Sequence, residues 1–114
     1  MEMKHILSVF FLLCAFLTLP VWAQNIVTRI PEAQRQQIFT DSVMAEMKAA
    51  QQAEMKYPIK PGITKDFIYA HTDEKNRLEE KYEQEVMIKY GISKDEMNKI
   101  GVEGLMKKWP LPPR

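Results

Sequence analysis

The chain has 114 residues and a single cysteine, and its 16 basic side chains nearly balance its 15 acidic ones, for a net charge of +1. This length allows one domain. A near-neutral chain has no net electrostatic attraction to nucleic acid or to an anionic membrane surface, so neither is expected as a partner.

The first 23 residues have the order of a secretory signal peptide. Lys4 precedes an apolar stretch over residues 6–19, which Pro20 ends. Val21 and Ala23 then supply the small residues of a peptidase site. The stretch is shorter than the roughly 20 apolar residues that cross a bilayer. The sequence therefore predicts cleavage after Ala23 and export to the periplasm or the medium, without stable membrane insertion afterwards. An uncleaved N-terminal membrane anchor is the alternative.

Removal of this leader takes away Cys14, so the exported chain has no cysteine with which to form a disulfide. It must be stable through packing alone. Stability is marginal at a length of roughly 90 residues, and association between copies is a common remedy. We therefore expect a weak homodimer.

Residues 24–30 are expected to form a short, flexible lead-in to the first helix. A helix over 31–57 follows, because Pro31 suits a first helical turn and good helix formers dominate the segment. Its apolar side chains recur every three or four residues, which predicts one buried stripe. The stripe consists of Phe39, Val43, Met47, Ala50, Ala53 and Tyr57.

Two prolines and a glycine over 58–62 predict a turn. Thr64 then caps a second helix over 65–90. The polar stretch 72–77 allows either one helix with a solvated turn or a break into two, and we expect one continuous helix. Its inner face is predicted to hold Phe67, Ala70, Leu78, Tyr82 and Val86, with Met87 and Tyr90 beside them.

Gly91 is suited to the left-handed end of that helix. Ser93 and Glu96 then have the spacing of a capping box, which predicts a third helix over 94–108. Its apolar positions are predicted to include Met97, Ile100, Val102 and Leu105.

Gly101 and Gly104 lie inside this third helix, where each glycine costs about 1 kcal/mol relative to alanine. The pair therefore predicts a close approach by a neighbouring helix. Trp109 follows, and residues 110–114 form a proline-rich, polyproline-like tail. If Trp109 is buried, it holds the tail against the helical domain as a clasp. If Trp109 is exposed, the tail is free to act as a polyproline ligand for a partner. We favour the clasp.

These elements predict an all-α fold, with a helical domain over 31–109. Two long helices joined by a short turn should form an antiparallel hairpin. The third helix is expected to fold back across its open end.

Four residues are weak candidates for a metal site. His71 and Glu74 lie one helical turn apart, but a structural zinc site takes four ligands. Met44 and Met47 could bind copper(I) through their thioethers, although methionine is also a common filler of helical cores. A solvated histidine and core methionines are the favoured interpretations, so neither a metal nor a cofactor is expected.

The corner over residues 86–101 resembles the helix-turn-helix of bacterial DNA-binding regulators, with Gly91 in the turn. The preceding helix is acidic, and the helix that would read DNA has few basic residues. We interpret the segment as a tight helical corner, which agrees with the expectation that nucleic acid is not a partner.

The chain shows no catalytic constellation and no phosphate-binding loop, so it is not predicted to be an enzyme. The predicted function is that of a small exported helical protein that binds a protein partner of unknown identity. A periplasmic metal-handling protein is the alternative.

Export gives the first testable prediction. Intact mass spectrometry of the protein secreted from cells that express the whole chain should show an N-terminus at Gln24, because the peptidase site ends at Ala23. A mass that retains residues 1–23, found in the membrane fraction, would instead establish the anchor.

Overall fold

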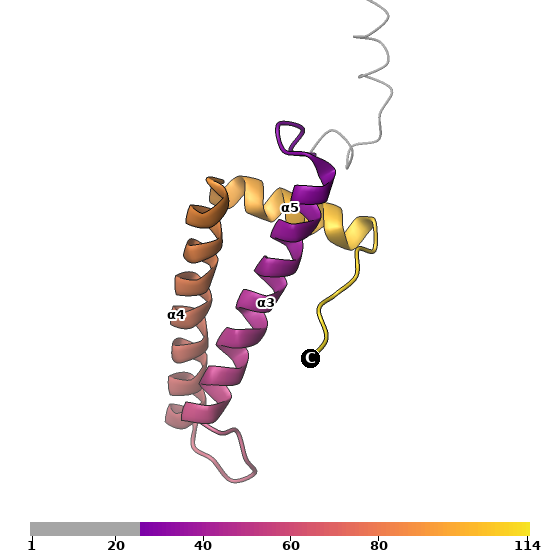
Figure 1. Ribbon diagram of the computed structural model, residues 1–114. Helices are drawn as coiled ribbons and strands as arrows, with labels where there is room; N and C mark the ends of the chain where they lie inside the picture. Colours follow the sequence, from indigo (N-terminus) through magenta and orange to yellow (C-terminus); the bar gives the residue numbers. More distant parts are fainter. Residues whose placement is uncertain (1–25) are drawn as a thin grey trace, which may run out of the picture.

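The computed structural model describes residues 26–114, and the predicted signal peptide lies outside them. This described part contains three helices and no strand, which confirms the all-α class. The helices are α3 (Glu32–Lys56), α4 (Lys65–Tyr90) and α5 (Lys94–Met106). α3 and α4 lie side by side in opposite directions, and α5 crosses α3 near its N-terminal end (Figure 1). None of the helices within 26–114 is both long and apolar enough to cross a membrane.

The ends of α3 follow from its two flanking prolines. Pro31 has an extended ψ of 147° and is the N-cap, so the helix begins one residue later than predicted. Glu32 places a negative charge in the first turn, where it interacts favourably with the helix dipole. The last helical residue is Lys56, since Pro58 cannot continue a helix.

α4 is one continuous helix through the polar stretch 72–77, as expected. The Thr64 hydroxyl oxygen accepts a hydrogen bond from the Phe67 N–H at 3.3 Å. Gly91 has a φ of 62°, and the Ile92 N–H donates to the Met87 carbonyl at 3.0 Å. This is a Schellman ending, in which glycine takes the left-handed conformation without steric cost.

α5 starts at the predicted capping box, in which Ser93 and Glu96 each accept the other's backbone N–H. It ends two residues before the predicted boundary. Lys108 has a φ of 56°, and the Trp109 N–H donates to the Gly104 carbonyl at 2.9 Å. A left-handed lysine costs about 1–2 kcal/mol. The ending is held because Pro110 disfavours helix at residue 109 and because Trp109 is buried.

The core lies where α3 meets both other helices, so the buried surface of α3 is wider than the single stripe predicted. Ile38 and Ile100 are fully enclosed. Ala45, Ala49 and Ala53 let α4 approach α3 closely, and the sequence interpretation overlooked the first two. The predicted stripe residues Val43, Met47, Ala50 and Tyr57 are only half-buried.

The two glycines of α5 have different environments. Gly104 is buried, and a Cβ atom there would overlap the Phe39 ring. Trp109 packs edge-on against the same ring, with centroids 5.7 Å apart, and is only 9% exposed. At Gly101, no described atom outside the helix's own backbone and the adjacent residues lies within 4 Å of an added Cβ. A close approach therefore occurs at Gly104, and the expectation for Gly101 is wrong within this chain.

Val102 and Leu105, predicted among the apolar positions of this helix, do not lie in the core. They are 54% and 69% exposed. The inner face of α5 is instead formed by Met97, Ile100, Glu103 and Gly104, so it includes a buried carboxylate.

The Glu103 carboxylate on the inner face of α5 forms an ion pair with Arg35 of α3. The Arg35 Nε and Nη2 atoms donate to the two Glu103 oxygens at 2.8 and 3.0 Å, and both side chains are buried. Arg35 Nη1 donates to the Ile30 carbonyl at 2.5 Å. Burial on its own raises the pKa of Glu103, but hydrogen bonds from Arg35 and Lys107 outweigh it and hold that pKa below 4.5. The carboxylate therefore stays ionised in the core.

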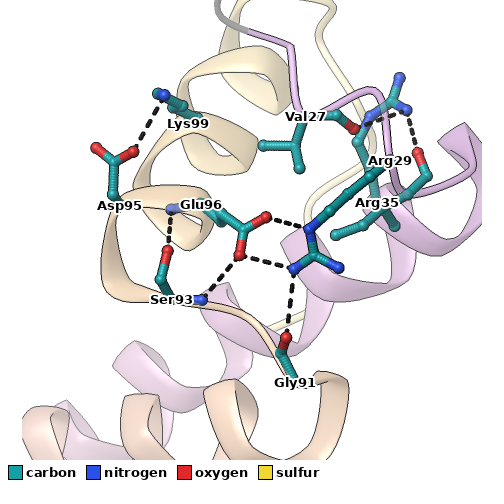
Figure 2. A network of polar contacts seen from close by, with 9 residues as sticks. Val27, Arg29, Arg35, Gly91, Ser93, Asp95, Glu96 and Lys99 are labelled. Carbon is teal, nitrogen blue, oxygen red and sulfur yellow. Dashed lines mark hydrogen bonds and ion pairs between the residues drawn. The ribbon is translucent and has the colours of Figure 1, made fainter.

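The segment before α3 is packed against the domain, so the prediction of a flexible lead-in is wrong for residues 26–30. Val27 and Ile30 are buried in the core. Arg29 donates to both Glu96 oxygens, at 2.6 and 2.7 Å, and to the Gly91 carbonyl at 3.3 Å (Figure 2). The hydrogen bonds from Arg29 and from the Ser93 backbone lower the pKa of Glu96 to about 2.

The buried pair supplies a stability prediction. Glu103→Ala leaves the Arg35 guanidinium in the core without its carboxylate, which typically costs about 3–5 kcal/mol. We expect a loss of that size in the free energy of unfolding, measured by urea denaturation. Glu79→Ala is the control, since Glu79 pairs with Lys75 at the surface, where a pair contributes about 0–1 kcal/mol. Equal losses in the two variants would contradict this account.

Candidate binding groove

A groove of about 500 Å³ runs along one side of the helical pair. Its walls come from three segments that are far apart in the sequence. α3 contributes Asp41, Met44, Ala45, Met47, Lys48 and Gln51. α4 contributes Tyr82, Glu85, Val86 and Lys89, and the C-terminal tail contributes Pro113 and Arg114. This volume lies within the range of about 300–1,000 Å³ that is usual for ligand sites.

The floor of the groove is apolar and adaptable. Met44 is 52% exposed and Met47 is half-buried. Tyr82 and Val86 are buried core residues that also reach the groove from α4. Methionine is unbranched and polarizable, so it adjusts to partners of different shape. The site therefore presents apolar surface that can repack around an occupant.

A neutralised cluster of polar groups lies at one end of the groove. Lys89 Nζ is 3.1 Å from Asp41 Oδ2, and the Tyr90 hydroxyl donates to the same oxygen at 2.5 Å. Burial alone raises the pKa of Asp41, but the hydrogen bonds from Tyr90, Lys89 and Gln37 outweigh it and lower that pKa. Asp41 therefore stays ionised, and its charge is offset by Lys89.

Tyr82 is a fixed part of the wall. Its hydroxyl donates to the Gln52 side-chain oxygen of α3. The Lys48 ammonium lies over the ring, 4.3 Å from the centroid, in a cation–π contact. Contacts on both the hydroxyl and the ring hold the phenol in one position beside the apolar floor.

The tail forms the wall opposite α4, and Trp109 anchors it. A smaller hollow of about 220 Å³ lies beside the anchor. It is lined by Ala33, Gln36, Gln37, Thr40, Trp109 and Pro110. Beyond it, the prolines restrict the tail to extended conformations, and Leu111 points into solvent. The tail therefore lies along α3 as a stiff segment that ends at the groove.

The structure separates the four metal candidates. Met44 and Met47 line the groove. His71 lies near the turn after α3, with its Nδ1 atom 2.7 Å from the Tyr57 carbonyl oxygen. Glu74 forms ion pairs with Arg77 at 2.6 Å and with Lys56 at 3.6 Å. Over residues 26–114, no three His, Cys, Asp or Glu side chains are grouped so that they could hold a metal ion.

The two charged residues that join α5 to α3, Arg35 and Glu103, were not identified from the sequence. Arg35 lies one turn before Phe39, and Glu103 lies three residues after Ile100. Each is therefore a charged residue on the apolar face of an amphipathic helix. Two such residues of opposite sign are a signal for a buried pair, because an unpaired buried charge is too costly.

Comparisons of the chain with known protein families, with characterised proteins and with solved structures give no match.

The tail wall gives a prediction. Trp109→Ala removes the ring that packs against Phe39 and should cost about 3 kcal/mol or more, as truncation of a buried aromatic does. Denaturant melts measure this loss. Leu111→Ala is the control within the same tail, because Leu111 is exposed and its loss should leave the midpoint unchanged. An unchanged midpoint for Trp109→Ala would show that the tail is free and would favour its role as a partner ligand.

Proposed function

We propose that this chain is a small exported binding protein, not an enzyme, that holds an amphipathic helix of a protein partner in the groove between α3, α4 and the tail. The observation that carries the proposal is the methionine-lined groove itself. Its apolar floor is partly exposed in the isolated chain, which is typical of surfaces that a partner covers.

The shape of the groove favours a helix as its occupant. α3 and α4 have 25 and 26 residues and run antiparallel, which creates the seam that a third helix fills in a bundle. A helix recognised in this way presents apolar side chains at spacings of three, four and seven residues. Met44 and Met47 offer the adaptable surface on which such anchors pack.

The chemistry of the lining supports binding over catalysis. Within the described lining there is no histidine, cysteine, serine or threonine to act as a nucleophile or general base. Asp41 has a lowered pKa and is paired with Lys89, so it is a poor proton acceptor near neutral pH. The groove can therefore exclude water from an apolar ligand.

A metal-handling role is the alternative, and the shared position of Met44 and Met47 in the groove favours copper(I) over zinc. Two thioethers are soft ligands of the kind that copper(I) prefers. The two proposals depend on different properties of Met44 and Met47: helix binding on their apolar bulk, and copper(I) binding on their sulfur atoms. Replacement of both by leucine keeps the bulk and removes the sulfur.

The test compares two methionines of α3. A partner captured from periplasmic extract by the wild-type protein should be lost with Met44→Glu, because a charge in the groove opposes apolar contact. Met55→Glu is the matched control, since Met55 is 81% exposed on the same helix and does not line the groove. Capture that is unaffected by Met44→Glu, or lost equally with Met55→Glu, would overturn the proposed site.

A second variant separates the two functions. Met44→Leu combined with Met47→Leu should retain the protein partner if the groove binds an apolar helix. Titration with copper(I) should then show no binding tighter than micromolar in either protein. Tight copper(I) binding by the wild type that the double variant loses would establish the metal-handling role instead.

A further inference from the structure

The outer face of α5 carries apolar side chains that have no partner within the described chain. Val102, Leu105 and Met106 are 54%, 69% and 57% exposed, although all three lie in a well-formed helix. The opposite face of the same helix is already buried against α3. α5 is therefore apolar on two sides, and only one side is used by this fold.

Gly101 lies beside this outer apolar surface. A glycine inside a helix is less stable than alanine, and Gly104 shows the usual compensation, a close approach by Phe39. Gly101 has no such neighbour among the described residues, so the fold of one copy does not require it. A glycine at this position leaves room for the backbone of a helix from a second molecule.

The charges of α5 show which helix suits this face. The helix has acidic residues in its first turn, among them Asp95, and basic residues just after its end, among them Lys108. Both Asp95 and Lys108 are exposed, and the Asp95 carboxylate also forms an ion pair with Lys99 of the same helix at 3.0 Å. Two α5 helices packed antiparallel, with the midpoint between Gly101 and Val102, would place Asp95 of one copy opposite Lys108 of the other. Asp95 then lies roughly 10 Å from the midpoint at 1.5 Å per residue, and Lys108 follows just after the opposite end of the helix.

We infer that the outer face of α5 is a self-association surface, on which a second copy packs its own α5 antiparallel across Gly101. The arrangement is two-fold symmetric, so both ends of the contact carry the same opposite-charge pair. In its centre, Gly101 of each copy lies against Val102 of the other. Antiparallel alignment also places the negative end of each helix dipole beside the positive end of its neighbour.

The length of α5 makes this a weak contact. Thirteen residues span roughly 20 Å, so one pair of helices buries far less than the roughly 800 Å² per partner of a standard interface. None of the described residues of α5 lines the groove, so both grooves of such a dimer stay open. The dimer would therefore present two binding sites, whatever occupies them.

Sedimentation equilibrium on the exported protein, recovered from cells that express the whole chain, tests the surface. The wild type should form a dimer at high micromolar concentration. Val102→Glu should weaken the dimer by about ten-fold or more, because it places a charge at the centre of the contact. Met55→Glu, an equally drastic change at an exposed apolar residue of α3, should leave it unchanged. A wild type that remains monomeric, or equal effects of the two changes, would overturn the inference.

Gly101→Ala separates the contact from the fold. Alanine fits the monomer, because the added methyl meets open space, and should raise its melting temperature at low concentration by about 4–8 °C. The same methyl should weaken the dimer, because it keeps the two backbones apart. Higher thermal stability together with unchanged dimerisation would contradict a close approach at Gly101.

A charge exchange tests the antiparallel direction. Asp95→Lys should weaken the dimer by about two- to five-fold, in the range of an exposed charge pair, and Lys108→Asp should do the same. The double variant should restore the wild-type affinity, because each pair is rebuilt with its signs exchanged. Failure of that rescue would overturn the proposed pairing. These readouts measure association alone, so their outcome is independent of whether a partner helix binds the groove.

Discussion

The buried ion pair between Arg35 and Glu103 is the constraint on which the arrangement of the three helices depends. Both charges lie in the core, and their removal from water is compensated only if the two parallel hydrogen bonds form. α5 can therefore cross α3 only in the position that brings Glu103 to the guanidinium. Apolar residues such as Ile100 would tolerate several crossing positions, whereas a bidentate pair tolerates one.

Several features follow from this crossing position. It brings Gly104 against Phe39, where the absence of a side chain is needed, and Trp109 then covers the other side of the same ring. The left-handed turn at Lys108 directs the chain back along α3. These contacts lie near the N-terminal end of α3, far from the turn that joins α3 to α4. They position the tail and, with it, one wall of the groove.

Local rules made the helix boundaries predictable, whereas the site depends on contacts between distant residues. Thr64, Gly91 and the capping box at Ser93 mark helix ends through their immediate neighbours, so those ends were located to within about two residues. The packing of residues 26–30 depends on partners 62 and 67 residues away along the chain. No local pattern records such pairings, and the groove was missed for the same reason, because its tail wall exists only after α5 has docked.

The groove stays open because α5 crosses α3 instead of lying along it. At 1.5 Å per residue, α3 is almost twice as long as α5, and the crossing covers only its first turns, around Arg35, Ile38 and Phe39. The middle of α3, from Met44 to Gln51, has α4 on one side and the end of the tail on the other. An incoming helix could occupy this place without breaking the ion pair or any contact of the core. The walls are already held by Tyr82 and Trp109, so binding would require little reordering of the domain, and its free energy would go mainly into the new apolar contact.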